Sequence, residues 1–580
     1  MLDEERKGLR KHKSLNINKQ KIINMKNSRK AVILMMVLML QAPQAYTKEV
    51  PRIMNFINFV RDIEPRDAAI TPQVLFETVK AEADAIHEYG FKGTWLLQYD
   101  ALIDTRYHAM MKEEMAHGCE VGGWWEITQP HVEEAGLKWR GRYPWDWHAD
   151  KGFAVGYTQE ERCLLVDVYM RKFKELFGQL PHSIGSWFID AHTLAYMRDK
   201  YGVEACCICR DQVGTDGYTL WGGYWHGAYY PSRLNAYMPA QTAGGQIDIP
   251  VFRMLGSDPL YQYNAGVGGA VQSVCTMEPT YVNAQKPEWV GWYLRCQTED
   301  PALGYTYFQA GQENSFTWAA FGKGYEVQLP QMAALSKQGK LKVETLIETA
   351  RDFRQKYPVT PPTACTAMRD YTDRQGRTIW FNSRYYRANI LWEADRMGIR
   401  DIHLFDERMQ SDYLDNVCTS NQCFYTTLPI VDGCLWSTND DMASLRFYKI
   451  EENGNLTELK GGEPIIKKKG DGMKVTWPLN NQQGNIVLTL TEGSIKAMCS
   501  NKKLKWCMQL NVYPNAELPF KSIKQTSLTA VPTLSKWAKK ENFNYTLTLK
   551  RGTFLDVRGQ KGQVFRIVPQ QNAAELSTIN

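Results

Sequence analysis

The sequence lacks the local motifs that identify many enzyme classes. It contains no G-x-S-x-G nucleophile elbow, no phosphate-binding P-loop and no G-x-G-x-x-G dinucleotide fingerprint. It contains no internal repeat, and no two Cys/His clusters have the spacing of a zinc site. These absences argue against α/β-hydrolases, P-loop enzymes, dinucleotide-dependent enzymes and repeat proteins.

Long apolar segments are scarce as well. The stretch 31–40 is too short to span a bilayer; a basic segment precedes it and small residues follow it up to Ala45. This order predicts a secretory signal peptide over residues 25–45, and no cysteine follows the apolar stretch until Cys119, so a lipid anchor is not indicated. We expect a periplasmic or secreted protein without stable membrane insertion.

A large excess of one charge is also missing, since the net charge of the 580 residues is only +6. Counting charges gives about +7 for residues 1–30 and about +10 for residues 441–580, which leaves about −11 between them. An acidic centre that is rich in tryptophan does not suit a phosphate backbone, so we expect no nucleic-acid partner. The length predicts two or more domains.

The 13 cysteines are an odd number, so at least one is unpaired within the chain. Cys418 with Cys423 and Cys499 with Cys507 are candidate disulfides, because export permits such bonds. The cluster in "ACCICRD" (205–211) is either a metal site or a buried strand, and the strand is favoured because cysteine behaves as a small apolar residue.

Between residues 46 and 429, short apolar segments alternate with longer amphipathic ones. Such alternation predicts an α/β fold, and its length suggests a distorted seven-stranded (β/α) barrel with inserted loops, of which 256–300 is the largest. Predicted strands lie at 53–60, 93–100, 119–126, 182–190, 204–211, 247–254, 304–313 and 399–407, and predicted helices at 71–90, 106–118, 158–178 and 192–202. Residues 430–580 have short alternating segments instead, which predicts a C-terminal antiparallel β-sandwich.

Parallel barrels carry their functional groups at the carboxyl ends of the strands. Carboxylates and indoles recur there in this chain, and an indole face suits the C–H face of a sugar. The candidate site residues are Arg61, Asp62, Trp124, Trp125, Glu126, Trp187, Asp190, His192 and Glu313.

Several of these candidates have an ordinary structural alternative. Trp124 and Trp125 point to opposite faces of a strand, so one is expected in the core and the other against a ligand. Glu126 beside them is expected to be partly desolvated, which raises the pKa of a carboxyl group. Asp190 is either a catalytic carboxylate or the N-cap of the helix from Ala191.

The order of the segments "GTWLLQYDALID", "MKEEMAHGCEVGG" and "LPHSIGSW" after a strand that ends in "RD" resembles the polysaccharide deacetylase homology fold, over about residues 52–260. The segments "WWEITQPHVEEAGLKWRGRYPWDWH" and "GSWFIDAHTLAYM" also resemble an uncharacterised family of exported bacterial proteins. The first resemblance implies a distorted (β/α) barrel that acts on a carbohydrate.

The metal positions of the deacetylases are changed here. The resemblance implies an Asp-Asp pair after the first strand and H-x-x-x-H after the third; this chain has Arg61 at the first of these positions, and Trp124 and Thr128 at the histidines. A divalent metal therefore lacks its nitrogen ligands. Family-57 amylases and α-mannosidases have a related barrel, and Asp190 and Glu313 stand at positions similar to their catalytic carboxylates.

We therefore predict a secreted glycoside hydrolase that cleaves a glycosidic bond with Asp190 and Glu313, with Glu126 as a further catalytic candidate and the other residues binding a glycan. No cofactor is expected in this case. Two alternatives stay open. One is a metal-dependent carbohydrate deacetylase with rearranged ligands such as Asp62, Glu126 and His131, and the other is a barrel that binds glycan without catalysis.

Overall fold

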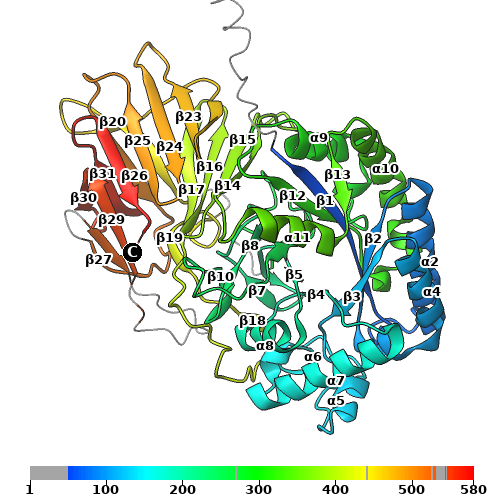
Figure 1. The fold of residues 1–580 in the computed structure, drawn as a ribbon. Helices are drawn as coiled ribbons and strands as arrows, with labels where there is room; N and C mark the ends of the chain where they lie inside the picture. The colour runs from blue at the N-terminus through cyan, green and yellow to red at the C-terminus, as the bar shows by residue number, and fades with distance from the viewer. Residues whose placement is uncertain are drawn as a thin grey trace, which may run out of the picture. The chain divides into compact units, whose positions relative to one another are not determined.

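The first part of the chain builds a curled, mostly parallel β-sheet with helices along its outer side (Figure 1). This computed structural model describes residues 50–267, 271–438, 442–523, 527–530, 543 and 545–579. The predicted signal peptide, residues 25–45, lies outside the described residues. None of the helices in the described ranges is long and apolar enough to cross a membrane.

The hydrogen-bonded order of this sheet is β12-β1-β2-β3-β4-β5-β11-β8, and β13 pairs with β1. Neighbouring strands are parallel except β8, which is antiparallel to β11. Within the described ranges β12 and β8 do not pair, so the sheet is curled rather than closed into the predicted barrel. The strands are β1 (Arg52–Val60), β2 (Gly93–Leu97), β3 (Glu120–Trp124), β4 (Ser183–Ser186), β5 (Ala205–Ile208), β8 (Ala228–Tyr229), β11 (Val251–Arg253), β12 (Thr306–Ala310) and β13 (Lys342–Glu344).

The helices begin at the capping residues that the sequence predicts. Thr71 accepts a hydrogen bond from the Val74 amide at the start of α2, and Thr158 and Glu161 form a capping box at α7. The helices are α2 (Pro72–Glu88), α3 (Tyr99–Ile103), α4 (Thr105–Ala116), α5 (Gln129–Glu134), α6 (Ala149–Gly152), α7 (Gln159–Phe177), α8 (Ala191–Tyr201), α9 (Pro287–Thr298), α10 (Trp318–Lys337) and α11 (Leu346–Lys356). Small strands in the loops are β6 (Gln212–Thr215), β7 (Tyr218–Leu220), β9 (Pro231–Ser232), β10 (Asn235–Pro239) and β18 (Cys423–Phe424).

The change to antiparallel strands comes earlier than the sequence predicts, at β14 rather than near residue 430. The predicted parallel strand 399–407 is wrong, because β17 pairs antiparallel with β16 and β20. Residues 399–404 are buried without alternation, which is the pattern of a parallel strand and explains the error. The sheet contains β14 (Thr363–Ala367), β15 (Arg377–Asn382), β16 (Tyr386–Glu393), β17 (Arg396–Leu404), β19 (Leu428–Asp432), β20 (Ser444–Ile450), β21 (Leu456–Glu458), β26 (Trp506–Asn511), β30 (Thr553–Asp556) and β31 (Gln563–Val568).

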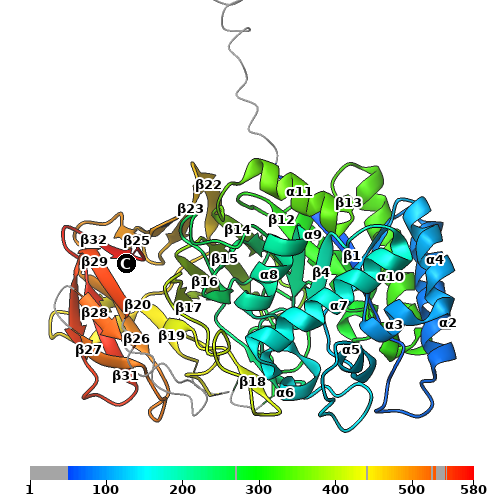
Figure 2. The same cartoon turned by 60° about the horizontal axis from the view of Figure 1, so that its bottom comes forward.

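A second antiparallel sheet lies beside the first, as Figures 1 and 2 show. Phe447 of β20 contacts Trp477 of β23, with ring centroids 6.4 Å apart, so side chains from the two sheets meet in one core. The antiparallel strands predicted after residue 430 are thus present, and the separability of this region stays a prediction. The second sheet contains β22 (Ile465–Lys469), β23 (Gly472–Pro478), β24 (Asn485–Thr491), β25 (Ser494–Cys499), β27 (Phe520–Ile523), β28 (Ser527–Ala530), β29 (Tyr545–Arg551) and β32 (Ala573–Ser577).

All 13 cysteines lie in described residues and are free thiols. The predicted Cys418–Cys423 and Cys499–Cys507 disulfides are therefore wrong. Cys499 and Cys507 belong to strands of different antiparallel sheets, and the Cys418 thiol donates to backbone carbonyls of its own loop. The cysteines of "ACCIC" are buried in and directly after β5, as the strand interpretation predicts.

Candidate active site

A pocket opens at the carboxyl ends of the parallel strands. Its wall includes Arg61 after β1, Trp187 after β4, Arg210 after β5, Leu255 after β11 and Glu313 after β12. Leu255 has a left-handed backbone at φ 77°, which is costly for a bulky residue and is typical of functional sites. The pocket therefore lies where parallel α/β sheets carry their sites.

Arg61 is the hub of this wall and is 1% exposed. Its Nε and Nη2 donate to Glu126 at 2.9 and 2.7 Å, and its Nη1 lies 2.7 Å from Glu313 Oε2. Although burial opposes the charge, the two carboxylates hold the pKa of Arg61 above its usual range. The bidentate geometry fixes the guanidinium, so Arg61 holds Glu313 in one position.

Glu313 and Glu126 occupy different places around Arg61. Glu313 lies in the pocket wall, accepts a hydrogen bond of 2.7 Å from Ser315 Oγ and lies 3.9 Å from Arg66 Nη2. Glu126 is 1% exposed, accepts a further hydrogen bond from Gln98 and is absent from the wall. Burial raises the pKa of Glu126, as predicted, but its contacts make it a support for Arg61.

Two further carboxylates line the pocket and were missed by the sequence reasoning. Burial raises the pKa of Glu278 to about 7, and the charges of Glu313 and Asp216 add to this effect while Arg210 opposes it. Burial, and secondly the charge of Glu313, also raises the pKa of Asp216. The segment "TDGY" could have pointed to Asp216, because Asp-Gly is typical of a tight hairpin turn. Both residues have a positive φ and form the turn between β6 and β7.

Indoles from two segments complete the pocket. Trp187 follows β4, is partly exposed and lines the pocket, as predicted. Trp145 and Trp147 come from the irregular segment between α5 and α6, where no periodic pattern pointed to them. The Trp145 ring covers the Arg61 guanidinium at 4.3 Å, which shields the ion pair from water.

The prediction that Trp124 or Trp125 faces a ligand is wrong. Trp124 is fully buried and stacks on Phe59, with ring centroids 4.1 Å apart. Trp125 is 1% exposed and packs edge-on against His131. Both faces of β3 are covered, so alternation along the strand leaves neither indole for a ligand.

Asp190 does not face Glu313 across the pocket as predicted. Its carboxylate accepts from the Thr193 amide at 2.9 Å and from Thr193 Oγ1 at 2.6 Å, and so caps α8. It is fully buried, forms an ion pair of 3.0 Å with Arg162 and is absent from the pocket wall. The helix-cap alternative therefore describes Asp190.

His192 and Asp62 are also absent from the pocket wall. His192 Nε2 lies 3.4 Å from the Cys163 thiol, in a contact between α7 and α8. The Asp62 carboxylate accepts hydrogen bonds of 2.8 and 3.0 Å from Arg106. Burial is the main cause, and the charge of Asp104 the second cause, that raises the pKa of Asp62 to about 7. His192 therefore contributes to helix packing, and Asp62 belongs to an ion pair near the surface.

The residues of the pocket do not fit a divalent metal with nitrogen ligands. Its wall contains no histidine or cysteine in the part of the chain that the structure describes. The rearranged ligand set also fails to converge: His131 Nε2 donates to the Leu165 carbonyl and the ring stacks on Tyr99, while Asp62 and Glu126 are held by arginines. Burial lowers the pKa of His131 to about 4.

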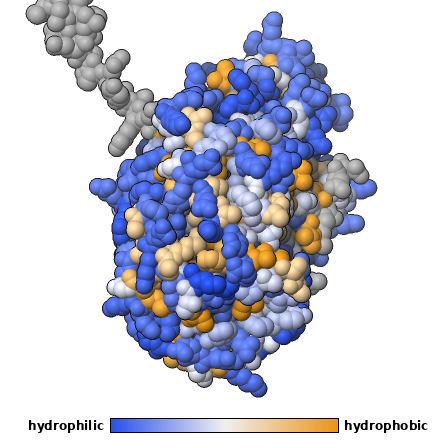
Figure 3. Space-filling view, turned by 90° about the vertical axis from the view of Figure 1, so that its right-hand side faces the viewer, coloured by the Kyte–Doolittle hydropathy of each residue, from blue (hydrophilic) through white to orange (hydrophobic). Residues whose placement is uncertain are grey.

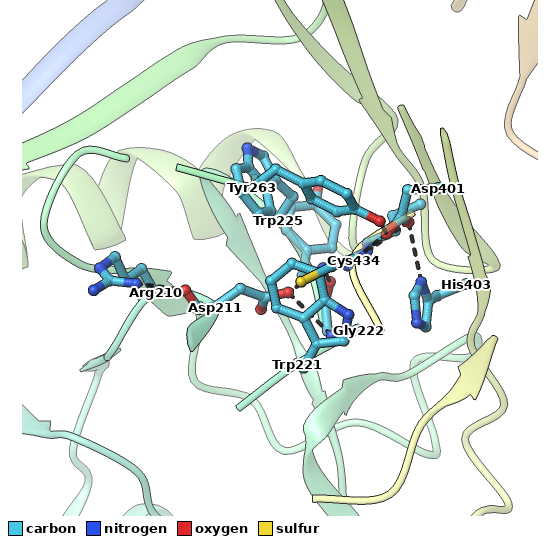
Figure 4. Close-up of polar contacts among 12 residues, drawn as sticks. Arg210, Asp211, Trp221, Gly222, Trp225, Tyr263, Asp401, His403 and Cys434 are labelled. Carbon is cyan, nitrogen blue, oxygen red and sulfur yellow. Dashed lines mark hydrogen bonds and ion pairs between the residues drawn. The ribbon is translucent and has the colours of Figure 1, made fainter. Parts of the chain in front are cut away.

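A buried charge network links the curled sheet to the first antiparallel sheet, and Figure 4 labels Asp211 and Asp401 of this network. Asp211, next to Arg210, pairs with Arg253 and Arg387, and Arg387 also pairs with Asp401. Each of these side chains is at most 1% exposed. Such a network fixes the segment that carries Arg210, because each charge is satisfied only in one arrangement.

His403 makes the stability of this network depend on pH. Although burial opposes the charged ring, Asp401 at 3.0 Å raises the pKa of His403. The contribution of the charged His403 to the free energy of unfolding is therefore full below about pH 6.5 and is lost as the pH rises through the higher pKa of the folded state. Urea unfolding across this range should show the decline, and His403→Gln should flatten it. A decline of the same size in His403→Gln would show that another group is responsible.

Comparisons with known proteins identify similar folds. No protein-family model matches the sequence, and no curated protein matches it. A structure from Parabacteroides distasonis, described as a candidate glycoside hydrolase/deacetylase, has a TM-score of 0.47 and 15% identity and covers 64% of this chain and 86% of its own. A candidate polysaccharide deacetylase from Mycobacterium smegmatis has a TM-score of 0.34 and 14% identity, with 54% and 94% covered.

A family 4 acetyl xylan esterase from Clostridium thermocellum, solved with a cobalt ion, has a TM-score of 0.24 and 9% identity, with 52% of this chain and 91% of that chain covered. The matched structures include a candidate polysaccharide deacetylase, the group whose fold the sequence resembles.

Proposed function

We propose that the protein is a carbohydrate-active hydrolase and that the pocket around Arg61 is its active site. The observation that carries the proposal is the pairing of two different carboxyl groups in one indole-lined pocket. Glu313 Oε2 lies 2.7 Å from Arg61 Nη1, whereas Glu278 is buried and its pKa is raised to about 7. Two carboxyl groups in different environments are what acid–base hydrolysis of a glycoside requires.

The roles of the two groups follow from their environments. Glu278 carries a proton at neutral pH for part of the time and donates it to the leaving oxygen. Glu313, which is positioned by Arg61 and by the hydrogen bond from Ser315, stabilises the positive sugar ring or activates water. Glu126 keeps Arg61 in place. Glu278 takes the proton-donor role that the sequence suggests for Glu313, and Glu313 takes the role that it suggests for Asp190.

The rest of the wall suits sugar binding. Trp187 offers a partly exposed aromatic face. Arg210 is 2% exposed, and its Nε has no hydrogen-bond partner, which leaves a buried donor for a sugar hydroxyl or acidic group. We propose that a glycan is the partner bound here.

Removing the Trp187 ring should weaken substrate binding. Trp187→Ala is expected to raise KM about fivefold with the fold intact, since one stacking contact contributes about 1 kcal/mol. Trp124→Ala is the matched control, because this fully buried ring should affect stability instead. Steady-state kinetics and thermal unfolding separate the two effects. An unchanged KM in Trp187→Ala would place the sugar elsewhere.

The activity should fall on the alkaline side of about pH 7. Glu278 must be protonated to act as the acid, so kcat/KM should decline as the pH rises through the pKa of this group. A pH–rate profile measures this limb, and Glu278→Gln should remove it together with most of the activity. A limb that persists unchanged in the residual activity of Glu278→Gln would assign it to another group.

A carbohydrate deacetylase is the second candidate. It is favoured by the resemblance of residues 52–260 to the deacetylase fold and by the names of the similar structures. Product analysis separates the candidates, because deacetylation releases acetate and leaves the chain length unchanged, whereas glycoside hydrolysis produces new reducing ends. Turnover that requires a divalent metal and releases acetate would support the deacetylase. Glycan binding without any product would support a non-catalytic barrel.

We also propose that the protein acts in the periplasm or outside the cell. The order of basic, apolar and small residues at 25–45 supports export. Mass spectrometry of the protein from its native host should find a mature chain that begins near Tyr46. An intact Met25 in that chain would refute the proposal.

A further inference from the structure

A second cluster of chemically active side chains lies away from the pocket, near the amino-terminal ends of β2 and β3. His87 belongs to the last turn of α2, and Glu114 belongs to α4. His117 follows α4 directly, and Cys119 precedes β3 by one position. The cluster is thus at the opposite ends of the strands from the pocket and plays no part in the proposed hydrolysis.

Three of these side chains converge, and the Cys119 thiol lies beside one of them, His87. One ligand atom each of His87, Glu114 and His117 lies within 4.8 Å of the others. His87 Nε2 lies 2.9 Å from Glu114 Oε2 and 3.8 Å from the Cys119 Sγ. The rings of His87 and His117 have centroids 5.1 Å apart. Ligand atoms around tetrahedral zinc lie about 3.3–3.7 Å apart, given its bond lengths, so small rotations would complete the set.

The charge of Glu114 supports a cation at this place. Its side chain is 7% exposed, and the buried Trp95 Nε1 donates to it at 2.9 Å. Within the described residues its ion-pair partner is His87, and no lysine or arginine lies within salt-bridge distance. A buried carboxylate without a permanent positive partner is costly, and a bound metal ion removes that cost.

We propose that His87, Glu114, His117 and Cys119 form a binding site for a divalent transition metal, with zinc as the best match. Two imidazoles, one thiolate and one carboxylate are ligands that zinc accepts in a closed tetrahedral site. The ion would tie the end of α2 to α4 and to the start of β3, which is a structural role. His117 is exposed, which gives the ion access from solvent. On the side of the molecule that carries α2 and α4, hydrophilic residues are interspersed with apolar ones (Figure 3).

Zinc titration of the metal-free protein tests the site directly. Calorimetry should show one zinc bound per chain, and zinc should raise the melting temperature of the wild type. Cobalt is the spectroscopic probe, since a thiolate ligand gives a charge-transfer band and tetrahedral geometry gives strong visible bands. Absence of zinc binding to the metal-free wild type would overturn the proposal.

Three variants locate the ion. His117→Ala, at an exposed position that should leave the fold intact, should weaken zinc binding by more than about 100-fold. Cys119→Ser should lose the thiolate–cobalt band. His182→Ala is the matched control, because this partly exposed histidine pairs with Glu204 outside the cluster. Equal zinc affinity in wild type and His117→Ala, or a thiolate band that persists in Cys119→Ser, would contradict the site.

Discussion

Glu313→Gln is expected to lower kcat by about 10²- to 10⁴-fold on any glycan that the wild type hydrolyses. The amide keeps the size and the hydrogen bond from Ser315 but removes the negative charge that faces the substrate. Because Arg61 keeps its bidentate contact with Glu126, the guanidinium stays in place and the fold should persist. KM should change little, since the loss concerns the transition state.

Stopped assays on purified protein measure this effect, and circular dichroism confirms the fold. Glu326→Gln is the matched control, since this exposed residue of α10 carries the same chemical change outside the pocket. It should leave kcat within error of the wild type. Full activity of Glu313→Gln would remove Glu313 from the mechanism.

Arg387→Met is expected to lower the free energy of unfolding by about 3–5 kcal/mol. The change removes one cation and leaves Asp211 and Asp401 buried without their shared partner. Arg387 is also surrounded by the rings of Trp221, Trp225 and Trp380, so water cannot replace the lost charge easily. The loss should therefore exceed that of an ordinary surface ion pair.

Urea unfolding measures this loss. Arg396→Met is the matched control, because Arg396 is 58% exposed and lies 3.8 Å from Glu458. It should cost less than about 1 kcal/mol. A triple variant combines Arg387→Met with Asp211→Asn and Asp401→Asn. Its loss of stability should be smaller than the sum of the three single losses, because no buried aspartate charge is then left without Arg387. Equal losses in Arg387→Met and Arg396→Met would show that the network contributes little.

The sequence predicts the parallel part of the fold well, because its signals are local. The cap at Thr71 and the capping box at Thr158 mark helix starts, and the strands between them follow. The strand at 399–407 was misplaced because burial on both faces hides the alternation that identifies an antiparallel strand. Sheet closure depends on long-range pairing, which no local pattern reports.

The site is only partly predictable for a related reason. Arg61 and Glu313 follow strands of the parallel sheet, so strand order alone brings them together. Glu278 and Trp145 come from loops without a periodic pattern, and their placement depends on tertiary packing. Asp190 shows the opposite error, since a strand-end carboxylate was needed to cap the next helix.

The most direct test of the central claim is mass spectrometry of the products from a panel of plant and host glycans, with wild type and Glu278→Gln compared in the presence of a metal chelator. The account predicts shorter glycans with new reducing ends from the wild type and a loss of about 10²-fold or more in the variant. Acetate release that the chelator abolishes, or equal product from both proteins, would contradict the assignment of Glu278 and Glu313 as the hydrolytic pair.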